Sequence, residues 1–334
     1  MPARFVLAVL LAAAALATPL VSVRAAPGRA GSGNEGVPAF GRVFVIVGEN
    51  TSLSQITPAR APYLSSALKP RAAWLTRYFA LTDGSLGDYV GMTSGQFVTC
   101  EKNNDFPFTN GDVPGQHACH QHVDNLFHQL DVRRVSWQEW NESAANPCDM
   151  FDHGATWSKN LYSAHHSPAL YFDDIQAHHS SEDIIPSPEC RQKVLPAGTT
   201  GPNDMSIFNS ALAAGQVAQF NLIIPNDCEN GHDPCGTHDA VRQFDDFLSR
   251  EVPLVEASPA FGPDGTIIVT WDEGADRDPK HVLFAVIGSH VAPGVYGKRR
   301  YTHYSLLRTL EDGYGISRHL AHAAHTRAIS GIWK

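Results

Sequence analysis

The chain has 334 residues, of which 43% are hydrophobic, and its formal net charge is -9. An acidic balance of this kind excludes the basic surface that a nucleic-acid-binding protein needs, so we expect no nucleic-acid partner. The length is sufficient for one large hydrophobic core. The sequence leaves the oligomeric state open.

The first residues predict a secretory signal peptide. An apolar stretch over residues 5–16 follows a basic residue, and it is too short to span a bilayer, which disfavours the alternative of an uncleaved anchor. Val23-Arg24-Ala25 supplies a small-x-small cleavage site. We therefore expect a secreted or periplasmic protein with no stable membrane anchor after signal removal. Its segments are predicted as a signal peptide (1–25), a flexible lead-in (26–36) and a single domain (37–334).

Six cysteines are an even number in a chain that we expect to be exported, and this predicts disulfides. A cysteine metal site is the alternative, but no pair of CxxC units supports it. The sequence does not fix the connectivity. Pairing neighbours in chain order gives Cys100–Cys119, Cys148–Cys190 and Cys228–Cys235.

Apolar runs alternate with amphipathic segments along the chain, a pattern typical of an α/β fold. Short runs rich in β-branched or aromatic residues predict strands that are buried on both faces. These runs are 43–47, 169–172, 220–224, 266–270 and 282–287. Apolar residues at helical spacing predict helices. These segments are 123–130, 239–250 and 304–312.

Two of the predicted strands run directly into acidic and amide side chains. Glu49 and Asn50 follow the first strand, and Asp272 and Glu273 follow the fourth. Open α/β sheets place ligand chemistry at such carboxyl ends. Adjacent carboxylates after a buried strand repel each other unless a cation or a proton intervenes, although a solvated turn is the alternative. Oxygen ligands favour Mg²⁺, Ca²⁺ or Mn²⁺, and histidines would add Zn²⁺ or Fe.

Ser85 lies between glycines, in Gly84-Ser85-Leu86-Gly87. We expect it to cap a helix that begins at Leu86, where its oxygen would face backbone N–H groups that suit an anion. Beside a metal, such a serine can attack phosphorus. Spacing alone favours the alternative of an ordinary N-cap, and no G-x-S-x-G elbow is present at this serine.

The chain contains 17 histidines, which are often structural. His232 lies in an acidic loop after the third predicted strand, His281 precedes the fifth, and His303 opens the last helix. His232 and its acidic neighbours could bind metal or phosphate. His281 and His303 could touch a phosphate oxygen or protonate a leaving group. The spacing in His117-x-x-His120-x-His122 does not by itself indicate a zinc site.

Several segments together carry a family resemblance, and they span nearly all of the predicted mature chain. Among them are VFVIVGENTS, YFALTDGSLGDYVGMTSG, FNLIIPNDCENGHD, IIVTWDEG and YTHYSLLRTLEDGYGI. They resemble the phosphoesterase family that contains bacterial and fungal acid phosphatases and bacterial phospholipases C, within the alkaline phosphatase superfamily. The resemblance implies an α/β three-layer sandwich with a central, mostly parallel sheet.

The resemblance also implies roles for individual residues. The implied metal ligands are Glu49, Asn50, Asp272 and Glu273, with Ser85 as a nucleophile bound to the same ion. His232 and His281 would lie at the phosphate or at a second metal position, and they are the further catalytic candidates. The implied substrate-binding residues are Asp88, His166 and His303. In this scheme Ser85 attacks the phosphoryl group, and water releases phosphate from a phosphoserine intermediate.

One departure from the family pattern bears on the substrate. The family usually reads Ser-Leu-Pro-Asn-Tyr at the nucleophile, where this chain has Ser85-Leu86-Gly87-Asp88-Tyr89. An ionised Asp88 would repel a phosphate dianion. We therefore expect that Asp88 is protonated in the working enzyme, or that it favours a less charged substrate such as a diester.

The leading interpretation is a secreted, metal-dependent phosphomonoesterase acting on a phosphate ester. The alternatives are a phospholipase C or another phosphodiesterase, and a protein that binds metal or phosphate but has lost turnover. A lipid substrate would need an apolar approach to the pocket, for which Phe106, Phe108 and Trp157 are candidates.

Overall fold

The computed structural model describes residues 35–97, 119–156, 161–177, 185–236, 239–275 and 277–334. All of these residues fall in one unit, Gly31–Lys334. The predicted signal peptide lies outside the described residues, as do Cys100, Phe106, Phe108, His117 and Trp157. The expectations that rest on them stay predictions, as does the start of the domain at residue 37.

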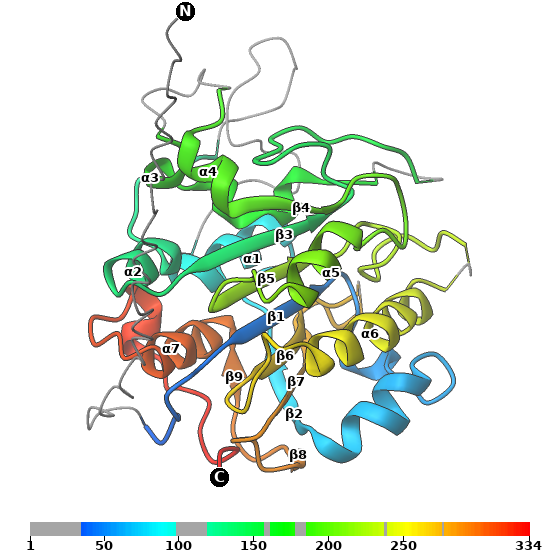
Figure 1. The fold of residues 1–334 in the computed structure, drawn as a ribbon. Coiled ribbons are helices and arrows are strands. Elements are labelled where there is room, and N and C mark those ends of the chain that lie inside the picture. The colour runs from blue at the N-terminus through cyan, green and yellow to red at the C-terminus, as the bar shows by residue number, and fades with distance from the viewer. Residues whose placement is uncertain (1–34, 98–118, 157–160, 178–184, 237–238, 276) are drawn as a thin grey trace, which may run out of the picture. The chain divides into compact units, whose positions relative to one another are not determined.

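Among the described residues, nine strands form one sheet in the order β4-β3-β5-β1-β6-β7-β2-β8, with β9 also paired to β2 (Figure 1). The strands are β1 (Val43–Gly48), β2 (Ala73–Phe79), β3 (Trp137–Glu142), β4 (Val194–Gly198), β5 (Phe220–Ile224), β6 (Thr266–Trp271), β7 (His281–Gly288), β8 (Gly294–Tyr296) and β9 (Tyr301–Thr302). β7 is antiparallel to β2 and β6, whereas the other pairs, such as β1 with β5 and β6, are parallel. The predicted mostly parallel sheet is confirmed.

Helices flank the sheet. They are α1 (Ser85–Ser94), α2 (Leu126–Val132), α3 (Asp173–Gln176), α4 (Pro188–Lys193), α5 (Ser206–Ala213), α6 (Ala240–Ala257) and α7 (His303–Gly313). Shorter 3₁₀ or π turns are η1 (Leu53–Gln55), η2 (Leu64–Leu68), η3 (Lys69–Arg71), η4 (Ala164–His166), η5 (Pro168–Tyr171) and η6 (Ala321–His325). In the view of Figure 1, α6 lies in front of the sheet and α1 behind it. This is the layered α/β arrangement that the sequence predicted.

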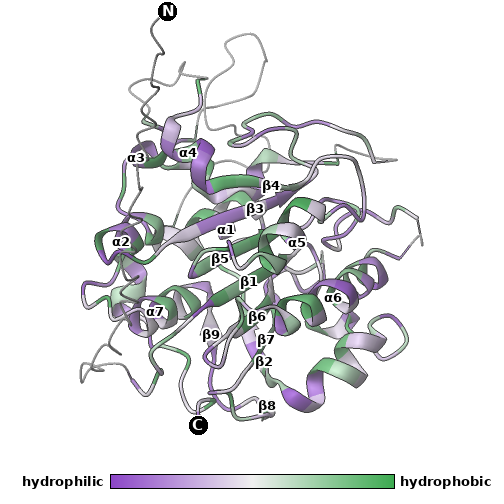
Figure 2. Ribbon diagram, viewed as in Figure 1, coloured by the Kyte–Doolittle hydropathy of each residue, from purple (hydrophilic) through white to green (hydrophobic). Residues whose placement is uncertain are grey.

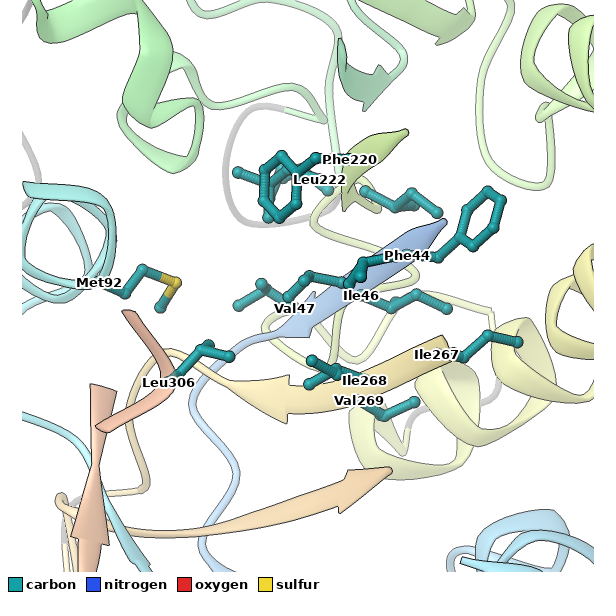
Figure 3. Packing of buried hydrophobic residues seen from close by; sticks show 14 of the residues in the cluster. Phe44, Ile46, Val47, Met92, Phe220, Leu222, Ile267, Ile268, Val269 and Leu306 are labelled. Carbon is teal, nitrogen blue, oxygen red and sulfur yellow. The ribbon is translucent and has the colours of Figure 1, made fainter. Parts of the chain in front are cut away.

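The hydrophobic core is centred on β1, which is buried along its whole length. Figure 3 shows Phe44, Ile46 and Val47 of β1 among side chains of β5 and β6, with Met92 and Leu306 extending the cluster to α1 and α7. Burying one such side chain stabilises the fold by roughly 1.5–3 kcal/mol. The core therefore fixes β1, β5 and β6 beside one another, and with them the loops that follow.

Most predicted elements are confirmed, with specific exceptions. The strands at 43–47, 220–224, 266–270 and 282–287 and the helices at 239–250 and 304–312 are present. The strand predicted at 169–172 is wrong, because this segment is the 3₁₀ turn η5, with a single β-bridge from Phe172 to Gln121. The helix predicted at 123–130 begins at Leu126, since Asn125 caps it by accepting a hydrogen bond from the His128 backbone.

Two of the predicted disulfides are confirmed, Cys148–Cys190 and Cys228–Cys235. Cys119 is also disulfide-bonded, and its predicted partner lies outside the described residues. Across the described part of the chain, no helix is both long and apolar enough to cross a membrane.

Candidate active site

The ends of β1 and β6 bring two acidic segments to one edge of the sheet. The two strands are parallel and paired through Gly48 and Trp271, so the residues that follow them are also neighbours. The Asp272 backbone N–H donates to the Gly48 carbonyl at 3.0 Å. The Asn50 backbone N–H donates to Asp272 Oδ1 at 3.4 Å. The structure thus brings together the acid and amide residues that the sequence singled out at these strand ends.

Asn50 turns the chain sharply after β1. Its φ of 40° lies in the left-handed region, which asparagine tolerates better than most residues. In this conformation its side-chain amide donates to Glu49 Oε2 at 3.0 Å. The same Glu49 oxygen accepts a hydrogen bond from Ser85 Oγ at 3.1 Å.

Ser85 is the first residue of α1, and the N-cap is Gly84. The prediction that Ser85 itself caps the helix is therefore wrong by one residue. Gly84 is extended, with φ -153° and ψ 121°, which places Ser85 in the first turn. Its hydroxyl is buried and also lies 3.5 Å from Glu273 Oε1. The positive end of the helix dipole thus lies at the nucleophile candidate.

The loop after β5 closes the other side of the cluster. The Asn230 carbonyl accepts a hydrogen bond from the Glu49 backbone N–H at 2.7 Å. The next residue, Gly231, has φ +101°, and a Cβ on it would lie 3.0 Å from the Glu49 carbonyl oxygen. Only glycine combines this conformation with so close an approach.

Asp227, in this loop, is a site residue that the sequence reasoning did not single out. Its Oδ1 lies 3.2 Å from His166 Nδ1, and His166 Nε2 lies 3.4 Å from Glu49 Oε1. Asp227 also accepts hydrogen bonds from Ser163 Oγ and Asn230 Nδ2. Burial alone would raise the pKa of Asp227, but His166 and these donors hold it below its ordinary value. The strand-end argument pointed to the acidic loop after β5, but it did not distinguish Asp227 from the other acids of that loop.

The acidic cluster is buried, and within the described residues its ion-pair contact is with His166, whose Nε2 lies 3.4 Å from Glu49 Oε1. Burial and the charge of Asp272 raise the pKa of Glu49 well above its ordinary value, and raise the pKa of Glu273 to about 9. Burial also raises the pKa of Asp272. Without a counter-ion, such carboxylates hold protons.

Within the described residues, three buried atoms of the cluster make no hydrogen bond. They are Glu49 Oε1 and His166 Nε2, which lie 3.4 Å apart, and Asp272 Oδ2. Buried polar atoms are almost always satisfied, so these atoms suit an additional partner. A divalent cation beside Glu49 and Asp272 would satisfy the two carboxylate oxygens and balance the charge. The donor set, mainly oxygens, fits a hard cation such as Mg²⁺, Ca²⁺ or Mn²⁺.

Asp88 lies in the first turn of α1, but its carboxylate turns toward the preceding loop. It accepts hydrogen bonds from the Leu81 backbone N–H at 2.6 Å and from Thr82 Oγ1 at 2.8 Å. Burial, together with the charge of Asp272, raises the pKa of Asp88 to about 8. A carboxyl that is uncharged at neutral pH agrees with the expectation that Asp88 is protonated in the working enzyme.

His303 is fully buried at the start of α7 and connects several parts of the site. Its Nδ1 lies 2.9 Å from the Tyr78 hydroxyl, and its Nε2 lies 2.5 Å from the Asp272 carbonyl oxygen and 3.5 Å from Asp88 Oδ1. Burial lowers the pKa of His303 to about 4. A neutral His303 therefore holds the Asp272 backbone and adjoins Asp88.

The remaining predicted histidines, His232 and His281, have other contacts. His232 pairs with Asp233, with 2.8 Å between Nδ1 and Oδ1, and its ring centroid is 6.3 Å from that of His166. His281 is at the correct edge of the sheet, but its ring stacks on Phe79 and its Nε2 lies 2.8 Å from the Thr76 carbonyl. Among the described residues, no hydrogen bond or ion pair joins His281 to the Ser85 cluster.

Comparisons with known proteins identify the family of this chain. The family model described as "Phosphoesterase family" matches residues 42–317. The chain belongs to the Phosphoesterase family. A phosphatidylinositol-3-phosphatase of Mycobacterium tuberculosis is 25% identical over 303 residues, covering 89% of this chain and 84% of that protein. A phosphate-repressible acid phosphatase of Penicillium chrysogenum is 25% identical over 282 residues, covering 83% of this chain and 60% of that protein.

The phosphoesterase chain thus spans less than two thirds of the length of the fungal relative. Among solved structures, a protein in the alkaline phosphatase superfamily from Vibrio parahaemolyticus matches with a TM-score of 0.56 and 12% identity, over 87% of this chain and 71% of that one. This likeness confirms the predicted fold class. The family and its phosphatase-named relatives make the protein a phosphoric ester hydrolase.

Proposed function

We propose that this phosphoesterase is a metal-dependent phosphomonoesterase in which Ser85 is the nucleophile. The observation that carries the proposal is the position of Ser85 Oγ, buried at the start of α1 and 3.1 Å from Glu49 Oε2. Serine hydroxyls in ordinary caps bond to their own helix, whereas this one faces carboxylates of two other loops. The names of the bacterial and fungal relatives, which are phosphatases, favour a monoester substrate.

The metal would be held by the residues at the two strand ends. These are Glu49, Asn50, Asp272 and Glu273, together with Ser85. When bound, a divalent cation lowers the pKa of a hydroxyl beside it and balances charge on a phosphoryl group. Glu49 Oε1 and Asp272 Oδ2, which are buried and make no hydrogen bond within the described residues, support this assignment.

The chain's own groups account for the remaining steps. Ser85 Oγ gives its proton to Glu49 Oε2, which lies 3.1 Å away, and attacks phosphorus. The bond from phosphorus to the ester oxygen breaks, and the phosphoryl group is transferred to Ser85. The backbone N–H groups at the start of α1 face the phosphoryl oxygens. His166, whose Nδ1 lies 3.2 Å from Asp227 Oδ1, is our candidate to give a proton to the leaving alcohol. Water then cleaves the phosphoserine, which releases phosphate and restores the Ser85 hydroxyl.

Asp88 supports the choice of a monoester over a diester. Because its pKa is raised to about 8, the side chain is uncharged at acidic and neutral pH. It therefore adds no charge that would repel a phosphate dianion in that range. A phospholipase C or another diesterase stays the runner-up.

The decisive experiment compares hydrolysis of p-nitrophenyl phosphate with that of its bis-ester, with and without chelator. Metal-dependent cleavage of the monoester, lost in Ser85→Ala, is the expected result. Preference for the bis-ester would move the assignment to a diesterase. Binding of metal without turnover of either substrate would favour a protein that has lost catalysis.

We also infer that the protein works outside the cytoplasm. The disulfides Cys148–Cys190 and Cys228–Cys235 support this, because such bonds persist in oxidising compartments. N-terminal sequencing of the exported protein tests it, and a mature start near residue 26 is the expected result.

A further inference from the structure

A second group of metal-ligand side chains lies outside the Ser85 cluster. His120, His122 and Asp173 each offer one ligand atom, and these atoms lie within 4.8 Å of one another. His120 Nδ1 is 2.7 Å from Asp173 Oδ1, and His122 Nδ1 contacts Asp173 Oδ2. Both imidazoles therefore meet the two oxygens of one carboxylate.

The backbone fixes this arrangement. The Gln121 N–H donates to the Tyr171 carbonyl at 2.6 Å, and the Asp173 N–H donates to the Gln121 carbonyl at 3.2 Å. This is a parallel bridge between Gln121 and Phe172. In an extended segment, residues i and i+2 point to the same side. The bridge thus turns His120 and His122 together toward Asp173.

The carboxylate at the centre of the group contacts both imidazoles. The Asp173 side chain is only 12% exposed. Its Oδ1 faces His120 Nδ1, and its Oδ2 faces His122 Nδ1. Imidazole nitrogens and carboxylate oxygens gathered in this way are ligand atoms that suit a transition-metal ion.

We propose that His120, His122 and Asp173 bind a divalent transition-metal ion of the Zn²⁺ class. Two imidazoles and a carboxylate suit zinc and related ions, whereas the oxygen-rich Ser85 cluster suits a harder cation. Three protein ligands leave a coordination position for water. This site is separate from the metal position proposed at Glu49 and Asp272.

An ion bound to this group would also affect the active site, because of where the group lies in the fold. Asp173 begins α3, directly after the turns η4 and η5, and η4 ends at His166. Both turns pack against α1, which begins at Ser85. An ion that joins Asp173 to His120 would restrain the segment that presents His166.

Zinc titration of the chelator-treated full chain tests the proposal. We expect isothermal titration calorimetry to lose one zinc equivalent in His122→Ala and in Asp173→Asn, or to show at least a tenfold weaker Kd. His122 is the safest change, since its side chain is 75% exposed. His290→Ala is the matched control, because His290 also pairs with an aspartate, at 3.1 Å, but with no second histidine. Its zinc binding should equal that of the wild type.

Equal zinc stoichiometry and affinity in the wild type and all three variants would overturn the proposal. Zinc bound only at the Ser85 cluster would also overturn it. X-ray absorption at the zinc edge provides a second readout that does not depend on folding of the variants. Imidazole scattering is expected for the first zinc equivalent bound by the wild type. A spectrum with oxygen ligands alone would also refute the site.

Discussion

Ser85 Oγ lies 3.1 Å from Glu49 Oε2, although the two residues are 36 positions apart in the chain. The contact joins the start of α1 to the end of β1. We expect Ser85→Ala to lower kcat for p-nitrophenyl phosphate by at least about a thousandfold, since the nucleophile is removed. Ser94→Ala is the control, because Ser94, in the same helix, donates to the Val90 carbonyl and accepts from the Gln96 backbone N–H. Comparable residual activity in the two variants would exclude Ser85 as the nucleophile.

Asp88→Asn should change the pH dependence of monoester hydrolysis. The pKa of Asp88 is raised to about 8, so the wild-type side chain gains its charge above that pH and repels the phosphate dianion. We expect wild-type kcat/KM to fall by up to about tenfold per pH unit above 8. Asp88→Asn should keep its activity there, because an amide does not ionise. Asp83→Asn, at an exposed position in the preceding loop, should follow the wild type. Superimposable profiles for Asp88→Asn and wild type would count against a role for this charge.

Asp227→Asn should destabilise the fold and impair activity, because it removes the partner of His166. Breaking a buried pair costs about 3 kcal/mol, which urea unfolding at pH 7 can measure. The pKa of Asp227 is lowered in the folded state, so its stabilising effect is present above the unfolded pKa of about 4. It is lost as the pH falls further and the folded carboxylate takes up a proton. The difference from wild type should therefore shrink at pH 3.

The control for the Asp227–His166 pair is Asp264→Asn, which removes the exposed partner of His290. Surface pairs contribute about 0–1 kcal/mol, so this variant should unfold close to wild type at both pH values. An Asp227→Asn protein as stable as this control would show that the His166 contact does not hold the loop.

Removal of divalent cations should lower both activity and stability. At a cation concentration a hundredfold above its Kd, binding adds about 2.7 kcal/mol to the free energy of unfolding. Thermal unfolding in EDTA, and after adding back Mg²⁺, Ca²⁺ or Mn²⁺, measures this effect. The gain should disappear in Glu49→Gln, which loses a ligand, and persist in Glu256→Gln, a glutamate away from the site that pairs with Arg71. An equal gain in both variants would place the cation elsewhere.

The strands that build the centre of the sheet could be predicted because their residues are almost all apolar. β3 could not, since its sequence WQEWNE is largely polar, and Figure 2 shows it mostly in purple, whereas β1 is mostly green. Its Glu139 is nevertheless buried, because Asn141 Nδ2 and the Ala169 backbone N–H donate to it. Burial of a polar side chain depends on partners distant in sequence, which local patterns do not reveal.

Many of the site residues could be predicted, because functional side chains of α/β proteins lie at the carboxyl ends of strands. Glu49 and Asp272 come together because β1 and β6 are paired in parallel, as the sequence suggested. The orientation of His281 could not be predicted in this way. It depends on β7 pairing antiparallel with β2, in register with Phe79, on which the imidazole stacks.

The early position of β1 in the chain also affects how the protein folds during synthesis. This strand is completed first, yet its two partners, β5 and β6, come from residues 220–224 and 266–271. At synthesis rates of about 5–20 residues per second, the apolar segment Val43–Val47 waits on the order of ten seconds or more for its neighbours. It must be shielded during that time, because an unpaired apolar strand aggregates readily. Folding yield should therefore depend on the holdase chaperones that accompany the growing chain, and a polar substitution in β5 or β6 should reduce that yield before it affects catalysis.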